Sequence, residues 1–327
     1  MEKTKIDELK KGPVKSIEIW EGMTVNELVL QMKDSGSFSS GTLAKAVDIY
    51  EQMIKDDAYI FLTLSGALVP AGLKKVIIKS IEKGWVNAIV STGANLVHDV
   101  LEVFGGKHYK GSPYLRDDIL SKNGINRIYD VFVTDEDFDE KFDKPIRSIY
   151  HDISTSRRGE TLSINEFIME IAKRLPNESS ILKSAYIHGV KVFAPAIQDS
   201  EYGIEAVRYN RNNNEKLRVD AFKDLEDIWS IREKNEKTGA IILGGGVPKN
   251  YIFQSSIFAQ KKLDYNMIDY VIQITLDRPE TGGLSGATLD EAISWGKIKE
   301  VARKVVVVSE ITLAFPIIVA ALLERFN

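Results

Sequence analysis

Residues 238–250 read Thr-Gly-Ala-Ile-Ile-Leu-Gly-Gly-Gly-Val-Pro-Lys-Asn. The apolar first half of this stretch is typical of a buried β-strand. The three glycines that follow allow backbone N–H groups to approach a phosphate closely at the start of a helix. The run has neither the Gly-x-Gly-x-x-Gly spacing of the common dinucleotide fingerprint nor the Gly-Lys-Ser/Thr ending of a P-loop. The glycines alone therefore leave two interpretations open, nucleotide binding and close packing of a helix on a strand.

A second segment, 282–297, ends in Ser294-Trp295-Gly296-Lys297. Lys297 follows Trp295 by two residues and Glu291 by six. A partly desolvated ammonium group beside an aromatic ring can lose its proton and form an imine. Lys249 is the other candidate nucleophile, although its place after a proline also suits the first turn of a helix. For both lysines the alternative is an ordinary solvated surface charge.

The same order of elements recurs along the chain: an apolar run, a loop of small residues and an amphipathic helix. Runs that are apolar throughout indicate parallel strands that helices cover on both faces. We therefore expect an α/β fold with a Rossmann-like, doubly wound, mostly parallel sheet. It would form a single large domain, residues 39–327, after an N-terminal arm, residues 1–38. The predicted strands are 59–64, 85–90, 190–194, 240–243, 270–274 and 305–308.

Between these strands the pattern predicts helices and connections. Ser39-Ser40-Gly41 supplies N-cap chemistry for a helix, and further helices are predicted from 73 and over 96–104, 164–175 and 311–323. The charged residues 136–144 are predicted to form a connection. Parallel sheets bind ligands at the carboxyl ends of their strands, so we expect the small-residue loops to converge on one edge, together with Asp199, Asp277 and Glu310.

Composition excludes several classes of function. The formal net charge of −4 provides no basic surface for nucleic acid, and the lack of cysteine excludes disulfides, thiolate metal sites and cysteine nucleophiles. The four histidines show no metal-ligand spacing, so no metal is expected. The N-terminus lacks the apolar core of a signal peptide, and the longest apolar run, 311–323, is too short to cross a bilayer. We expect a cytoplasmic protein that binds neither nucleic acid nor membrane.

Six segments, in order and with similar spacing, resemble one known family from about Ser39 to the C-terminus. They are Val-Ser-Thr-Gly-Ala-Asn at 90–95, Asn-Gly-Ile-Asn-Arg-Ile at 123–128, Pro195-Ala196 with Asp199, Leu-Gly-Gly-Gly-Val at 243–247 with Lys249, Ser285-Gly286-Ala287, and Glu-Ala-Ile-Ser-Trp-Gly-Lys at 291–297. Together they resemble the deoxyhypusine synthase family, and Ser-Trp-Gly-Lys is the most specific of them.

The resemblance implies NAD bound between paired subunits of a homotetramer, and transfer of the aminobutyl group of spermidine. In the implied cycle, NAD takes a hydride from the carbon beside the secondary amine of spermidine. Lys297 captures the resulting imine, with loss of 1,3-diaminopropane. The butylimine then passes to a lysine of the precursor of the hypusine-containing translation factor and is reduced there. This agrees with a dinucleotide beside a Schiff-base lysine.

Residue by residue, the resemblance also implies the ligand contacts, with Lys297 as the catalytic residue. The expected NAD contacts are Gly66, Ala67, Leu68, Val69, Pro70, Thr92, Gly93, Asp199, Gly245, Leu276, Asp277, Glu310 and Ile311. The expected substrate contacts are His98, Asn250, Gly282, Gly283, Glu291 and Trp295. A carboxylate and an indole face are suitable partners for an alkylammonium.

Three positions depart from the family pattern, all in the predicted amine pocket. Asn250 stands where the family has a substrate-binding histidine, and Leu284 and Ile204 stand where it has aspartates, with Glu205 next to the latter. Each charged hydrogen bond is worth about 1.5–3 kcal/mol, so the departures bear on the substrate. Two alternatives to a deoxyhypusine synthase stay open: transfer to a small amine such as putrescine or agmatine, as in homospermidine synthases, and a non-catalytic NAD-binding scaffold.

Overall fold

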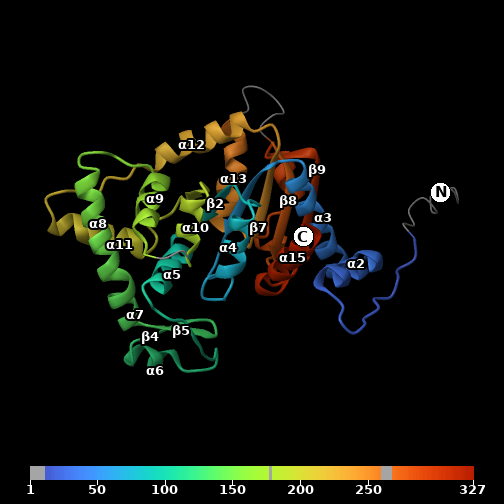
Figure 1. Cartoon of the computed structure of the whole chain (residues 1–327), viewed down its shortest axis with the longest axis horizontal. Coiled ribbons are helices and arrows are strands. Elements are labelled where there is room, and N and C mark those ends of the chain that lie inside the picture. Colours follow the sequence, from blue (N-terminus) through green and yellow to red (C-terminus); the bar gives the residue numbers. More distant parts are fainter. Residues whose placement is uncertain (1–11, 177–178, 259–266) are drawn as a thin grey trace.

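A computed structural model describes residues 12–176, 179–258 and 267–327 (Figure 1). Six strands form one sheet, in the order β6-β2-β1-β7-β8-β9, and every pair of neighbours is parallel. The strands are β1 (Tyr59–Leu64), β2 (Ala88–Ser91), β6 (Lys191–Phe193), β7 (Thr238–Leu243), β8 (Ile268–Thr275) and β9 (Ile298–Val308). Each overlaps a predicted strand, so the α/β fold with a doubly wound parallel sheet is confirmed.

The strand order reverses between β1 and β7. From β1 the chain moves outward through β2 to β6, then returns to the other side of β1 and moves outward through β7, β8 and β9. Ligands bind parallel sheets at such a reversal, beyond the carboxyl ends of the strands. Leu64 pairs with Leu243, and just beyond them the Ser65 hydroxyl donates to the Gly245 carbonyl at 2.5 Å.

Helices bury both faces of the sheet. Successive strand residues point to opposite faces and so belong to different cores. In β1, Leu62 and Leu64 belong to one core and Phe61 to the other. The helices that contribute to the first core include α3 (Phe38–Lys55), α4 (Lys74–Glu82), α5 (Gly93–Val103), α9 (Ile164–Arg174), α10 (Ile181–Ile187) and α15 (Ile311–Arg325). Those of the second core are α12 (Ala221–Lys234), α13 (Gly246–Phe258) and α14 (Leu289–Ser294).

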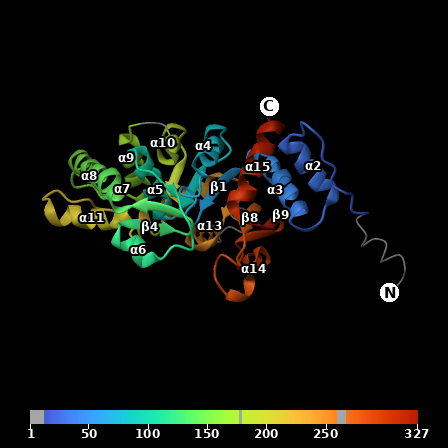
Figure 2. The same ribbon diagram turned by 90° about the horizontal axis from the view of Figure 1, so that it is seen from below.

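A small antiparallel sheet, which the sequence did not predict, follows α5. It has the order β3-β5-β4 and lies beside α6; Figure 2 shows it with α6 on the lower side of the molecule. The elements are β3 (Tyr109–Lys110), α6 (Asp117–Lys122), β4 (Ile125–Ile128) and β5 (Val131–Thr134). These strands are short and mostly half-exposed, so they lack the apolar runs that identified the main sheet.

The prediction of a connection over 136–144 is wrong. These residues are helical and run without a break from α7 (Asp135–Phe138) through a π-helical turn (Asp139–Asp143) into α8 (Lys144–Ser156). Thr134 caps the start by accepting the Asp137 N–H, and Phe142 is fully buried. The charged residues, which suggested a connection, instead occupy mainly the solvated side of the helix. α11 (Glu201–Asn212) packs against α8.

Two helix starts also differ from the prediction. α3 begins at Phe38, earlier than the Ser39–Gly41 cap would place it, and α5 begins at Gly93 instead of 96. His98 therefore lies in the middle of α5. Within the predicted arm, α2 (Val25–Ser35) packs against α3 and α15 and buries Val29, while residues 1–11 lie outside the described residues. The boundary at 38 stays a prediction.

The described ranges contain no helix with both the length and the apolar character that crossing a bilayer would take. In the same ranges, no three His, Asp or Glu side chains are grouped as a metal site.

Candidate active site

All the loops predicted to bind NAD follow the carboxyl ends of parallel strands and therefore share one edge of the sheet. Residues 66–70 follow β1, Thr92-Gly93 follows β2 and Asp199 follows β6. Gly245, Leu276-Asp277 and Glu310-Ile311 follow β7, β8 and β9. The expected convergence is thus what the topology produces, whereas contact of each residue with NAD stays a prediction.

One glycine of this edge, Gly66, is open to solvent. Gly66 is exposed, has a φ of +80°, and has no atom within 4 Å of the position a Cβ would take. Thr92 is the N-cap of α5, and no side chain caps this helix start. A helix N-terminus of this kind favours a phosphate. Leu68 and Val69 are instead buried and donate their N–H groups to Asn95, so they brace the loop.

The three-glycine loop, in contrast, is covered by protein. A Cβ at Gly245 would lie 2.4 Å from the Cα of Ser285, and the Gly246 N–H donates to the Ser285 hydroxyl at 2.9 Å. The buried Gln273 side chain of β8 donates to the carbonyls of Gly244 and Ser285, at 2.9 and 2.7 Å. Close packing, the second interpretation of the glycines, is therefore realised at Gly245.

Lys249 is part of this packed junction. Its side chain is buried, with 3% exposure, and its ammonium donates to Gln273 Oε1 at 3.0 Å and to the carbonyls of Ala287 and Ser285 at 2.6 and 3.5 Å. Burial lowers its pKa to about 8, an effect that Lys297 reinforces and that Glu291 and Asp277 oppose. All three N–H bonds of the ammonium are occupied, so Lys249 ties the segment around Ser285 to the sheet.

Lys297 reaches its position through the turn that ends α14. The Gly296 N–H donates to the Ile293 carbonyl at 2.9 Å and the Lys297 N–H to the Ala292 carbonyl at 3.0 Å, which is a Schellman motif. The motif needs a left-handed residue, and Gly296 has a φ of +66°. The chain therefore turns back after Trp295, and Lys297 Nζ lies 5.5 Å from the centroid of the indole ring.

We expect Gly296→Ala to damage this turn. A left-handed conformation costs a residue with a Cβ about 1–2 kcal/mol, so the unfolding free energy, measured in urea, should fall by that amount and imine formation on Lys297 should slow. Gly296→Asn is the matched control, because asparagine tolerates the left-handed region better. Equal losses in the two variants would contradict a role for the backbone conformation.

The side chains at this turn line a cavity of about 190 Å³. Its lining residues are Lys249, Asn250, Phe253, Leu284, Ala287, Thr288, Glu291, Ala292, Trp295 and Lys297. The structure thus brings together four predicted site residues, Asn250, Glu291, Trp295 and Lys297. His98, Gly282 and Gly283 do not line the cavity. Phe253 and Thr288 were missed, because a phenylalanine in a helix and a threonine cap carry no functional signal in the sequence.

The two candidate nucleophiles differ in what their amines contact. The lowered pKa of Lys249 favours it as a nucleophile, but its ammonium donates to three protein acceptors. Among the described residues, no hydrogen-bond or ion-pair partner within 4 Å is found for Lys297 Nζ or for the Glu291 carboxylate, and the Trp295 side chain is 61% exposed. Since a nucleophile must direct its lone pair at the substrate, geometry favours Lys297.

His98 lies in a separate buried cluster. Its Nδ1 is 2.9 Å from Nε2 of His108, whose Nδ1 is 2.8 Å from Glu102, and its ring packs edge-on against Phe138. Glu102 also pairs with Lys74 at 3.1 Å. Burial, reinforced by His108 and opposed by Glu102, lowers the pKa of His98 to about 4. Within one chain, the contact of His98 with His108 joins α5 to the segment that leads into the small sheet.

Acid should weaken the fold through His98. The unfolded side chain titrates near 6.5 and the folded one near 4. As the pH falls from about 6.5 towards 4, the unfolded state takes up a proton that the buried ring does not, so stability is lost over that window. We expect a loss on the order of 3 kcal/mol. His98→Gln should lack this part of the pH dependence of unfolding, and an unchanged pH profile would contradict the assignment.

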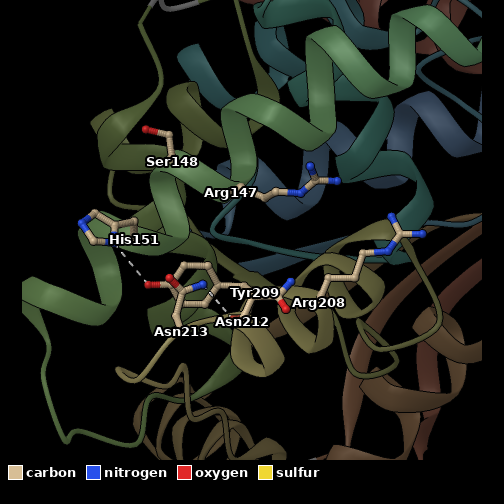
Figure 3. A pocket seen from close by; sticks show the side chains of 7 residues that line it. All are labelled: Arg147, Ser148, His151, Arg208, Tyr209, Asn212 and Asn213. Carbon is tan, nitrogen blue, oxygen red and sulfur yellow. Dashed lines mark hydrogen bonds between the residues drawn. The ribbon is translucent and has the colours of Figure 1, made fainter.

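Glu205 does not replace the carboxylate missing at Ile204. Its side chain is fully buried and accepts from the guanidinium groups of Arg147 and Arg208, on the side of α11 that faces α8. These arginines border a larger cavity of about 590 Å³ (Figure 3), which shares no residue with the Lys297 pocket. Glu205 and Asp143 both form ion pairs with the two arginines beside this cavity.

Comparison with known proteins agrees with this geometry. The profile of the deoxyhypusine synthase family matches residues 27–322. A Methanosarcina thermophila protein named "Probable deoxyhypusine synthase" is 44% identical over 96% of both chains. One from Archaeoglobus fulgidus, "Probable deoxyhypusine synthase 1", is 40% identical over 95% of this chain and 98% of its own. A crystal structure from Entamoeba histolytica described as a deoxyhypusine synthase has a TM-score of 0.65 at 21% identity, covering 92% of this chain and 93% of that one, and shows the same fold. The chain therefore belongs to the deoxyhypusine synthase family of transferases.

Proposed function

We propose that this protein transfers the aminobutyl group of spermidine through an imine on Lys297 to a lysine of the hypusine-type translation factor precursor. The observation that carries the proposal is the Lys297 pocket. The Lys297 amine lies beside the Trp295 indole ring and in one cavity with Glu291. The neighbouring Lys249 amine is fully hydrogen-bonded. The family relationship supports the same reaction class.

Four residues of the pocket have roles that follow from their chemistry. The Glu291 carboxylate binds the terminal ammonium of the aminobutyl group, and the Trp295 ring covers the alkyl chain and its positive charge. Lys297 adds, as the free amine, to the carbon beside the secondary nitrogen. Lys249 holds the segment around Ser285 against the glycine loop, so that the wall of the cavity keeps its shape.

The carboxyl edge of the sheet offers groups suited to NAD. Gly66 and the uncapped start of α5 would hold its phosphates, and Asp199, Asp277 and Glu310, which follow the ends of β6, β8 and β9, would bind its riboses. Bound there, NAD supplies reversible hydride removal from the donor carbon. The proposal includes a homotetramer that works in the cytoplasm, as the family resemblance implies.

The direct test uses purified protein with NAD and spermidine labelled in its butyl half. Release of 1,3-diaminopropane, together with a label that becomes fixed to the protein after borohydride reduction, supports the transfer. Adding the translation factor precursor should then move the label onto that protein. If neither product amine nor fixed label forms with any polyamine, the protein is an NAD-binding scaffold and the proposal is wrong.

A small-amine acceptor is the second candidate, because Leu284 and Asn250 give the pocket fewer charges than a polycation would use. The same labelled enzyme distinguishes the two acceptors. Putrescine that accepts the label more efficiently than the precursor protein would favour this second reaction.

A further inference from the structure

The Lys297 pocket contains few negative charges for the site of a polycation. Of its ten lining residues, Glu291 is the only carboxylate, whereas Lys249 and Lys297 are both basic. Asp277 is near enough to raise the pKa of Lys249 but does not line the cavity. Within the described chain the cavity can therefore pair with one ammonium group of a ligand.

The remaining wall of the pocket is apolar or uncharged. Leu284, with 48% of its surface exposed, and Trp295 lie at its accessible side, and Phe253, Ala287 and Ala292 complete it. An ammonium placed against Leu284 would gain no charged partner from this wall. An alkyl group in the same place would bury apolar surface, which is favourable.

Building on the proposed function, we infer that the pocket recognises the two halves of its amine substrate differently. The aminobutyl half that is transferred is bound by charge at Glu291. The half that leaves is bound by apolar contact with Leu284. The substrate class is thus N-alkyl-1,4-diaminobutanes, whose leaving arm needs no terminal ammonium, and Leu284 sets this specificity.

The chemistry is unchanged by the leaving arm. With N-propyl-1,4-diaminobutane, a hydride and a proton leave the donor, and NAD holds the two electrons as in the proposed function. Lys297 then replaces the propyl nitrogen: the bond from the donor carbon to that nitrogen breaks and a C=N bond to Lys297 Nζ forms. Propylamine leaves with both hydrogens of the lysine amine.

The test compares spermidine with N-propyl-1,4-diaminobutane, in which a hydrogen atom replaces the terminal ammonium of the leaving arm. With wild-type protein and NAD, we expect the two kcat/KM values, from release of 1,3-diaminopropane or propylamine, to agree within about threefold. One charged hydrogen bond would favour spermidine by at least about tenfold. A spermidine preference of that size would overturn the inference.

Leu284→Asp supplies the missing charge and should raise the ratio of spermidine to N-propyl activity by at least about tenfold. Leu284→Asn is its matched control, nearly equal in shape but neutral, and should leave the ratio within about threefold of wild type. Glu291→Gln should lower kcat/KM for both substrates by the same factor. If Leu284→Asp and Leu284→Asn gave the same ratio, Leu284 would not set the specificity.

The inference and the proposed function can fail separately. No amine release from either compound would contradict the proposed function. Calorimetric titration of both amines into Lys297→Ala protein with NAD compares their affinities without catalysis. A tenfold tighter binding of spermidine there would overturn the inference even if transfer is observed.

Discussion

Lys297→Ala is expected to abolish the borohydride-trapped adduct and to lower the rate of amine release by at least about 1000-fold, because it removes the amine that carries the transferred group. The fold should be retained, since Lys297 Nζ contacts the Trp295 ring at the accessible side of the pocket and ties no element to another. Single-turnover amine release and mass spectrometry of the trapped protein measure the two effects.

Lys297→Arg is the matched control for charge. Arginine keeps a cation near Trp295 but stays protonated and forms no imine, so it should be as inactive as alanine. Lys249→Ala should still form the adduct, although more slowly, because its amine serves the packing around Ser285. An adduct that disappears in Lys249→Ala and persists in Lys297→Ala would reverse the assignment of the nucleophile.

Asp99→Ala is expected to cause the largest loss of stability, about 3–5 kcal/mol of unfolding free energy. The carboxylate is fully buried in α5 and accepts from the Ser180 hydroxyl at 2.7 Å and from the N–H groups of Ile181 and Leu182 at 3.0 and 3.1 Å. It also lies 3.2 Å from the buried ammonium of Lys74. Its removal leaves the N–H groups of Ile181 and Leu182 without their acceptor and leaves the buried Lys74 ammonium with one carboxylate partner, Glu102, in place of two.

Two variants separate these contributions in urea denaturation. Asp99→Asn keeps one acceptor oxygen for the start of α10, so it should lose less unfolding free energy than Asp99→Ala. Lys74→Met removes the buried ammonium and leaves Asp99 its three hydrogen-bond donors. It too should lose less unfolding free energy than Asp99→Ala. If Asp99→Ala lost under 1 kcal/mol, the carboxylate would have no structural role in joining α5 to α10.

The main sheet was predictable because burial on both faces leaves a direct mark on the sequence. Each strand contains an apolar run, and a run such as Ala240–Leu243 needs no knowledge of its neighbours to be recognised. The contact of Lys297 with Trp295 was predictable for a related reason, since Trp295, Gly296 and Lys297 are consecutive and one turn places them together. Local chemistry of this kind can be inferred from a sequence.

The contacts that the sequence could not predict join residues that are far apart. Nothing near Gly245 indicates that Ser285 covers it, and nothing near Glu205 indicates that Arg147 of another helix engages it. The helix over 136–144 was missed for a different reason. Its charges dominate the composition, whereas the single buried ring of Phe142 contributes to holding it in place.

The position of β1 in the sheet has a consequence for how the protein is made. One neighbour of β1, β2, follows within 30 residues, but the other, β7, begins at residue 238, and the Ser65–Gly245 contact spans 180 residues. Contacts this distant in sequence slow folding. During synthesis, one side of β1 must remain unpaired until β7 leaves the ribosome. An unpaired apolar strand is prone to join other chains, so the nascent N-terminal half is the stage at which this protein is most exposed to aggregation.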